Sequence, residues 1–172
     1  VLPVTQLVAG AAITLTATNV DAQNAVTLTI RDAAGQTSSV SVTVLPSALL
    51  SAFAITPTSN TTCSGVPATA LNRAAICSGE SGLASVTAKS AGAIVLPNRQ
   101  IRFDVVQGAY NFVLDQTGTS LAKAQTVLTD QNGQASVVIR TDSAAASQAG
   151  LVRATDVTSG NRVDGAFTIV QA

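Results

Sequence analysis

The chain has 172 residues, 47% of them hydrophobic, 3% aromatic and 10% charged, and its nine basic and nine acidic residues cancel to zero net charge. This apolar content argues against a disordered tail, and the lack of a basic cluster argues against a nucleic-acid-binding surface. The length allows one or two domains, and no apolar run approaches the roughly 20 residues that span a bilayer.

Residues 1–46 are predicted to form a separate, partial immunoglobulin-like β-module. Three segments, 12–20, 25–31 and 38–45, alternate apolar residues with Thr or Ser. This period of two is typical of an antiparallel sheet with one face in water. A fourth, weaker strand is predicted over 2–8, where Pro3 would place it at a sheet edge.

The apolar residues of these segments are predicted to share one face that could drive self-association. They are Ile13, Leu15, Val26, Leu28, Ile30, Val40, Val42 and Val44. Such a face needs a second layer to cover it. The cover could come from missing upstream residues, from residues 50–172 or from another copy of the chain. The chain starts at Val1 without an initiator Met or a signal peptide, as expected of a mature or truncated product.

Residues 47–172 are predicted to form a second domain after a short linker. Short alternating segments bounded by turn residues predict its strands at 49–55, around 86–88, and at 101–106, 110–114, 135–139, 151–156 and 166–170. Seven or eight short strands without a helical period predict an all-β fold, an antiparallel immunoglobulin-like β-sandwich. An eight-stranded barrel is the alternative.

Cys63 and Cys77 are separated by thirteen residues and are predicted to form a disulfide. The alternative is a pair of buried free thiols in a reducing cytosol. Two Cys without any His cannot supply the four ligands of a structural zinc site. A disulfide predicts an oxidising compartment, meaning the periplasm, the cell surface or the medium. Residues 66–76, inside the loop, are predicted to form a short helix or a loop held by the disulfide.

Asn132-Gly133 is predicted to form a tight hairpin turn. Asn-Gly favours the positive backbone angles that such turns require. The strand that follows would then point Val137 and Ile139 into the core.

The order VTAK…G…P…QIRFDVVQG…TDQNGQASVVI resembles the bacterial immunoglobulin-like repeat of invasin and intimin stalks. The resemblance covers roughly residues 50–172 and rests mainly on TDQNGQASVVI and the PNRQIRF strand. It implies a surface-exposed structural or adhesive role and names no ligand.

The sequence predicts no enzyme, no cofactor and no metal site. The chain has no His, so a Ser-His-Asp or Cys-His arrangement is impossible. It has no glycine-rich phosphate-binding motif, and most Asp residues lie in predicted turns rather than in the clusters that calcium needs. Arg102 and Asp104 share one face of a predicted strand, where a surface ion pair with a neighbouring strand is expected.

Three functions fit these observations. The first is a non-enzymatic extracellular structural or adhesive module, a surface stalk or spacer whose partners are neighbouring immunoglobulin-like modules. The second is a subunit of an extracellular filament or pilus, assembled by strand complementation between copies of the chain. The third is a carbohydrate-binding accessory module, which needs an aromatic platform, although the chain has no Trp and Tyr110 is its single Tyr.

Overall fold

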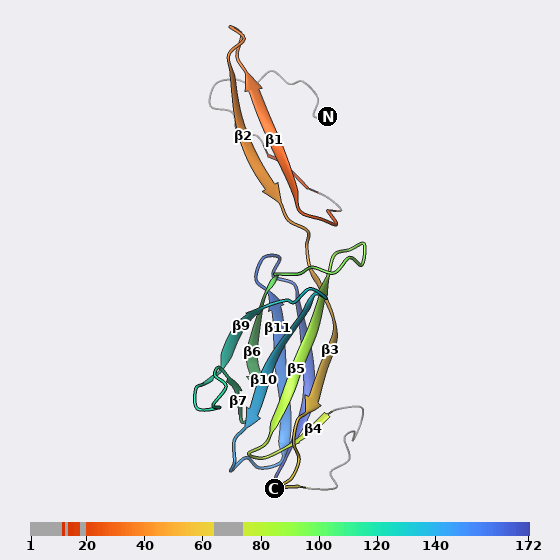
Figure 1. Cartoon of the computed structure of the whole chain (residues 1–172), viewed down its shortest axis with the longest axis vertical. Coiled ribbons are helices and arrows are strands. Elements are labelled where there is room, and N and C mark those ends of the chain that lie inside the picture. The colour runs from red at the N-terminus through yellow and green to blue at the C-terminus, as the bar shows by residue number, and fades with distance from the viewer. Residues whose placement is uncertain (1–11, 13, 18–19, 64–73) are drawn as a thin grey trace.

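The computed structural model describes residues 12, 14–17, 20–63 and 74–172 (Figure 1). A two-stranded hairpin, β1 (Asn24–Arg31) and β2 (Thr37–Val44), lies beyond one end of a two-layered β-domain (Figure 1). The described part of the chain contains no helix with the length and hydrophobicity of a membrane span. The predicted strand over 2–8 lies outside the described residues.

Two five-stranded sheets form the larger domain. The first has the order β3 (Leu49–Pro57), β5 (Ser81–Lys89), β10 (Gln134–Thr141), β7 (Tyr110–Val113) and β8 (Leu121–Ala122). The second has the order β4 (Ala74–Cys77), β12 (Arg162–Val170), β11 (Gln148–Asp156), β6 (Gln100–Gln107) and β9 (Ala124–Leu128).

This strand order is that of an immunoglobulin-like sandwich. Strands β3, β5, β10 and β7 take the places of strands A, B, E and D, and β6, β11 and β12 take those of C, F and G. All named strand pairs are antiparallel except β4 with β12. The predicted all-β sandwich is confirmed, and two separate sheets exclude the barrel.

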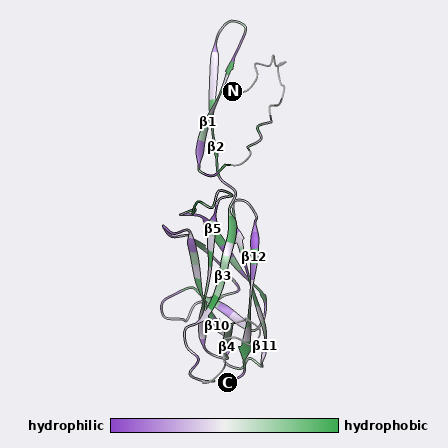
Figure 2. Cartoon of the chain, turned by 90° about the vertical axis from the view of Figure 1, so that its right-hand side faces the viewer, coloured by the Kyte–Doolittle hydropathy of each residue, from purple (hydrophilic) through white to green (hydrophobic). Residues whose placement is uncertain are grey.

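The core lies between the two sheets. Its side chains come from strands in which inward-facing and outward-facing residues alternate. Along β10 every second residue is buried, including Val137 at 3% and Ile139 at 0% exposure, as predicted. The few aromatic residues concentrate here: Phe103, Tyr110, Phe112 and Phe167 are fully buried and pack edge to face. Figure 2 shows hydrophobic and hydrophilic residues interspersed along the strands.

The turn at Asn132-Gly133 does not close a hairpin, which corrects the prediction. The preceding strand β9 pairs with β6 in one sheet, and the following strand β10 pairs with β5 and β7 in the other. The turn therefore crosses between layers. Only Gly133 has a positive φ, at +72°, and the Asp130 carboxylate accepts hydrogen bonds from the backbone N–H groups of Asn132 and Gln134, each at 2.8 Å.

The strand predicted over 12–20 is also wrong for the residues that the structure describes there. Residues 12, 14–17 and 20 are not in a strand. Their alternation of Thr with apolar residues resembles that of β1, but a strand needs a neighbour to share its backbone hydrogen bonds. The partner of β1 is β2.

Candidate functional site at the linker

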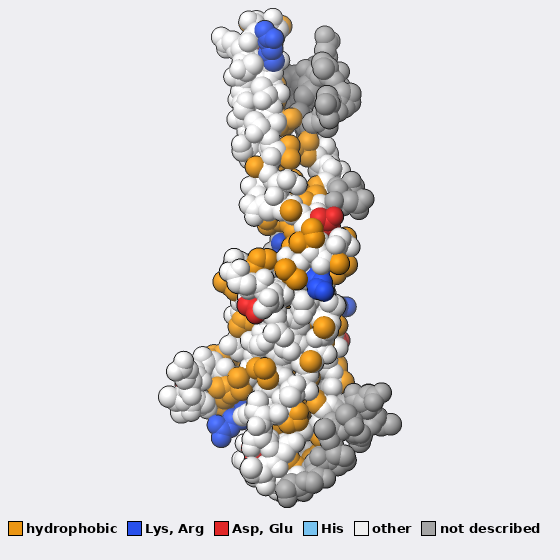
Figure 3. All heavy atoms as spheres, turned by 45° about the vertical axis from the view of Figure 1, so that its right-hand side comes forward, with side chains coloured by type: hydrophobic (Ala, Val, Ile, Leu, Met, Phe, Trp, Pro, Cys, Tyr) orange, Lys and Arg blue, Asp and Glu red, His pale blue; other side chains and the backbone are white. Residues whose placement is uncertain are grey.

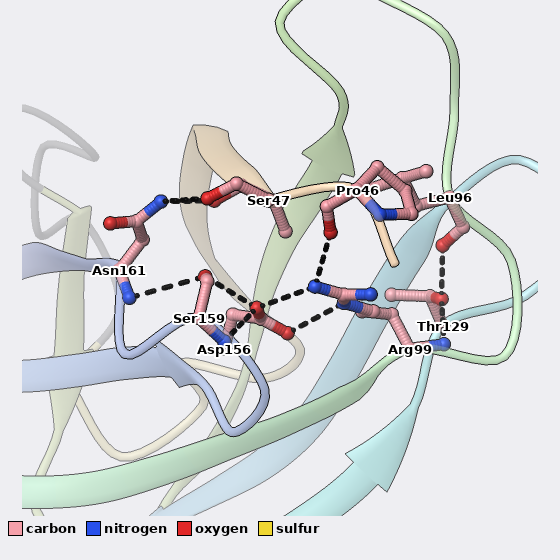
Figure 4. Close-up of polar contacts among 9 residues, drawn as sticks. Pro46, Ser47, Leu96, Arg99, Thr129, Asp156, Ser159 and Asn161 are labelled. Carbon is pink, nitrogen blue, oxygen red and sulfur yellow. Dashed lines mark hydrogen bonds and ion pairs between the residues drawn. The ribbon is translucent and has the colours of Figure 1, made fainter. Parts of the chain in front are cut away.

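The linker between hairpin and sandwich, residues 46–48, is fastened to the sandwich by side chains. The Arg99 guanidinium donates from Nη2 to the carbonyl oxygen of Pro46 at 2.7 Å (Figure 4). The Asn161 amide donates from Nδ2 to the Ser47 hydroxyl at 3.2 Å and to the Ala48 carbonyl oxygen at 2.7 Å. Pro46 and Ala48 are buried. The linker is therefore a bonded part of the sandwich end rather than a free tether.

Arg99 is itself held by a buried carboxylate. Its Nε and Nη2 donate to Oδ1 and Oδ2 of Asp156 at 2.9 and 3.0 Å, and the two side chains are 9% and 0% exposed (Figure 4). Asp156 ends β11 and Arg99 precedes β6, and the pairing of these two strands brings them together. Removing one partner of such a buried pair leaves an uncompensated charge, which costs far more than the pair itself contributes.

Asp156 remains ionised because its oxygens are well supplied with donors. Burial raises the pKa of the Asp156 carboxyl, but hydrogen bonds from Arg99 and Ser159 outweigh this effect and hold the pKa below its ordinary value. Ser159 donates from its backbone N–H at 2.8 Å and from its hydroxyl at 2.5 Å. The carboxylate thus orients Arg99 toward the linker.

Two further loops complete this cluster. The Thr129 hydroxyl accepts from the Arg99 backbone N–H at 2.8 Å and donates to the Leu96 carbonyl oxygen at 2.6 Å (Figure 4). We call Arg99, Thr129, Asp156, Ser159 and Asn161 the linker clamp. It joins residues 96–99, the turn after β9 and the β11–β12 turn to the linker.

The chain segment that enters the hairpin, before β1, also contacts the sandwich. Asp21, which precedes β1, accepts a hydrogen bond from the backbone N–H of Gly92 at 2.7 Å. Gly92 lies in the loop after β5. Both chain segments that enter and leave the hairpin are therefore bonded to the same end of the sandwich.

The linker clamp was not predicted from the sequence. The sequence pattern predicts turn positions for most Asp residues, Asp156 among them, and points to no role for Arg99 or Asn161. Their pairing could not be inferred because 57 positions separate Arg99 from Asp156. The one local signal is a charged residue on the inward-facing alternation of β11, where Val152 and Ala154 are buried like Asp156.

The β1 and β2 members of the predicted apolar face lie on one side of the hairpin, where most of them are exposed. Val26 lies opposite Val42, and Leu28 lies opposite Val40. Exposure is 43% for Val26, 54% for Val40 and 36% for Val42, while Leu28 is half-buried. On the side of the molecule drawn in Figure 3, hydrophobic side chains reach the surface at several places along the described residues. Of the other predicted members, Leu15 and Ile30 are exposed, Val44 is half-buried, and Ile13 lies outside the described residues.

The structure joins Cys63 and Cys77 in a disulfide, with a Cα–Cα distance of 5.8 Å. Cys77 ends β4, a strand that the sequence did not predict because it is short and Ala-rich. The Asn60 amide donates to the Ala75 carbonyl oxygen at 3.1 Å and accepts from the Cys77 backbone N–H at 3.2 Å. This side chain supplies strand-like bonds to the free edge of β4.

Other polar groups form surface ion pairs. Arg102 pairs with Asp104 of its own strand at 2.9 Å, not with a neighbouring strand as predicted. Arg153 of β11 pairs with Asp164 of β12 at 2.8 Å. Exposed pairs of this kind contribute little to stability, because water and salt screen the charges. Among the described residues, no group of three acidic, His or Cys residues could hold a metal ion.

Comparisons with known proteins leave the family open. No family model matches the chain, and no curated protein matches it. Domains 4 and 5 of the S-layer protein SbsC align over 77% of this chain and 59% of that chain, with 12% identity and a TM-score of 0.41. SbsC domains 1–6 align over 87% of this chain and 20% of that one, with 11% identity and a TM-score of 0.42.

A β-glucuronidase from Parabacteroides merdae aligns over 86% of this chain and 16% of that chain, with 11% identity and a TM-score of 0.40. The chain thus spans about three fifths of the two-domain S-layer structure and a fifth or less of the two larger ones. The fold assignment rests on the strand order of the sandwich itself.

Proposed function

We propose that the chain is a non-enzymatic extracellular structural module, a stiff spacer of the kind from which surface stalks of tandem immunoglobulin-like modules are built. The linker clamp carries this proposal. A flexible tether would leave its backbone groups to water, whereas residues 46–48 bond to the buried side chain of Arg99 and the half-buried side chain of Asn161.

The path of the chain supports a spacer. The linker enters at one end of the sandwich, and β12 ends at the opposite end (Figure 1). Modules joined through opposite ends extend in line, so each adds its length to the stalk. The invasin and intimin resemblance predicts the same use. The disulfide favours an oxidising compartment.

Backbone amide relaxation by NMR tests the stiffness. In the unmodified chain, amides of the β1–β2 hairpin should report the same tumbling time as amides of the sandwich. The variant Asp21→Ala/Asn161→Ala removes the contacts to Gly92 and to residues 47 and 48. Its hairpin should tumble independently while the sandwich is unchanged.

Asp32→Ala is the matched control, because Asp32 accepts hydrogen bonds only within the hairpin turn. It should leave the common tumbling time intact. Independent tumbling of the hairpin in the unmodified chain would refute the stiff spacer.

The exposed hairpin face favours a second candidate, a filament subunit completed by strands of another copy. Of the described strands, β1 and β2 pair only with each other, and an exposed apolar face with open strand edges promotes such association. Sedimentation velocity would then show polymers that persist on dilution. Val40→Asp should dissolve them, whereas Ser39→Asp, on the opposite face, should not. A monodisperse monomer of the unmodified chain would exclude this function.

The carbohydrate-binding alternative loses its main residue. Tyr110 is fully buried, and its hydroxyl donates to the Leu151 carbonyl oxygen at 2.6 Å. Burial raises the pKa of this hydroxyl. Tyr110 therefore packs in the core and cannot present a flat surface to a sugar.

A further inference from the structure

A spacer transmits tension, and the first strand to receive it from the linker is β3. Among the strands that the structure describes, it lies at a sheet edge and pairs only with β5. None of its nine residues is fully buried. Its pairing register shifts between Ser51 and Ala54, where Ala52 has a φ of +50°. By contrast, β12 at the other end of the load path pairs on both sides and buries Phe167 and Ile169. Under load, β3 should separate first.

The segment that follows β3 in the chain is held to the sandwich more firmly than β3 itself. Thr58 donates to the Ser81 carbonyl oxygen from its backbone N–H at 2.9 Å and from its hydroxyl at 2.8 Å. The Thr61 hydroxyl donates to Glu80 at 2.6 Å, and Asn60 bonds to the edge of β4. Cys63 then leads through its disulfide to Cys77.

Cys77 is anchored on several sides. It is 0% exposed and lies beside Val170 in the parallel pairing of β4 with β12. Its carbonyl oxygen accepts from the Thr141 hydroxyl at 2.6 Å. The next residue, Ser78, donates from its N–H to the Val170 carbonyl oxygen at 2.8 Å.

We propose that the Cys63–Cys77 disulfide is a load bypass. It carries tension from the linker past residues 64–76 and directly into the core at Cys77, the last residue of β4, so that β4 is not pulled from its Ala74 end. The inference rests on the proposed spacer function, because only a chain under tension uses such a bypass.

The need for a bypass follows from β4 itself. Without the disulfide, once tension has separated β3 from β5, the load is passed along the chain to Ala74, the first residue of β4. Strand β4 has four residues, and β12 is its only partner strand within residues 20–63 and 74–172. It carries Ile76, which is 0% exposed and packs against Gly82. Pulling β4 away would therefore open the core, and the sandwich would unfold.

Constant-load single-molecule pulling tests the bypass. Handles attach at Leu45, which is 44% exposed, and at the C-terminus, so that tension enters at the linker. The oxidised chain is compared with Cys63→Ser and with the chain treated with a water-soluble phosphine. The phosphine takes up the oxygen of one water molecule as its oxide while the disulfide becomes two thiols.

We expect the unfolding rate under load to rise at least about tenfold in both disulfide-free forms, since unfolding then starts at β4. Without load, in urea, the unfolding rate should change less than about twofold, because a disulfide acts mainly on the unfolded chain. Phosphine added to Cys63→Ser should have no effect in either assay.

Equal acceleration with and without load would refute the bypass, since the disulfide would then simply stabilise the native fold. An unchanged rate under load would refute it as well. Neither result bears on the spacer, which the relaxation experiment tests. Conversely, a loosely jointed hairpin would refute the spacer but leave this measurement valid, because the handle at Leu45 pulls the linker directly.

Discussion

In the hairpin, Val26 lies opposite Val42, and the two are 43% and 36% exposed; in the sandwich, Val86 lies opposite Ala135, and the two are 0% and 1% exposed. Both pairs sit on the apolar face of an antiparallel ladder. The difference is the second sheet, which covers the pair in the sandwich. Alternation creates an apolar face, but only a second layer makes that face a core. Equivalent substitutions in the hairpin and in the sandwich should therefore differ in their effect on stability.

The largest contrast should come from two arginines. Arg99→Met leaves Asp156 buried without its partner and should lower the free energy of unfolding of the sandwich by about 3–5 kcal/mol. Arg31→Met, at the exposed end of β1, should change it by less than about 0.5 kcal/mol. Urea denaturation of each variant measures both values. Equal losses in the two variants would show that the buried Arg99–Asp156 pair matters no more to stability than an exposed arginine.

Truncating a branched side chain should give the second-largest difference in the free energy of unfolding between the two regions. Ile139→Ala removes fully buried atoms and should cost about 2–5 kcal/mol. Val40→Ala removes atoms that are already largely in water, and its cost to the same unfolding transition should stay below about 0.5 kcal/mol. A large loss for Val40→Ala would mean that something covers the hairpin face in solution.

Two glycines with positive φ, one in each region, allow the same comparison for a substitution that acts on the backbone. A Cβ at Gly133 would lie 2.7 Å from the Ala88 carbonyl oxygen, whereas a Cβ at Gly35 would meet only the flexible end of Arg31, at 3.2 Å. Gly133→Ala should therefore cost about 1–3 kcal/mol in sandwich stability. Gly35→Ala should leave the denaturation midpoint of the sandwich unchanged. A tolerated Gly133→Ala would contradict the close approach of the two chains.

The smallest effect should appear on acidification. Because the folded-state pKa of Asp156 is lowered, its contribution to stability is complete above the unfolded value of about 3.9 and is lost as pH falls through the folded pKa. Stability of the sandwich should therefore decline below about pH 4. Asp156→Asn should flatten that decline in acid titrations followed by circular dichroism. An unaltered slope would contradict the assigned ionised pair.

Features that depend on a local period can be predicted from the amino-acid sequence alone. Alternation placed strands over most of residues 49–170 and put Val137 and Ile139 inside, because the pleat sends successive side chains to opposite faces. It likewise identified the apolar face of β1 and β2. The disulfide partners followed from there being two Cys in the chain.

Which strands share a sheet, and which side chains meet at the linker, depends on the packing of the whole sandwich. The Asn132-Gly133 signal specifies a tight reversal but not whether the strand returns to the same layer, so the crossing from β9 to β10 was not foreseeable. Arg99 meets Asp156 because β6 and β11 pair, and that pairing is fixed by packing across the whole sandwich. The linker clamp depends on this long-range choice. A period of two carries no information about it, because the period describes one strand and the clamp requires four separate segments.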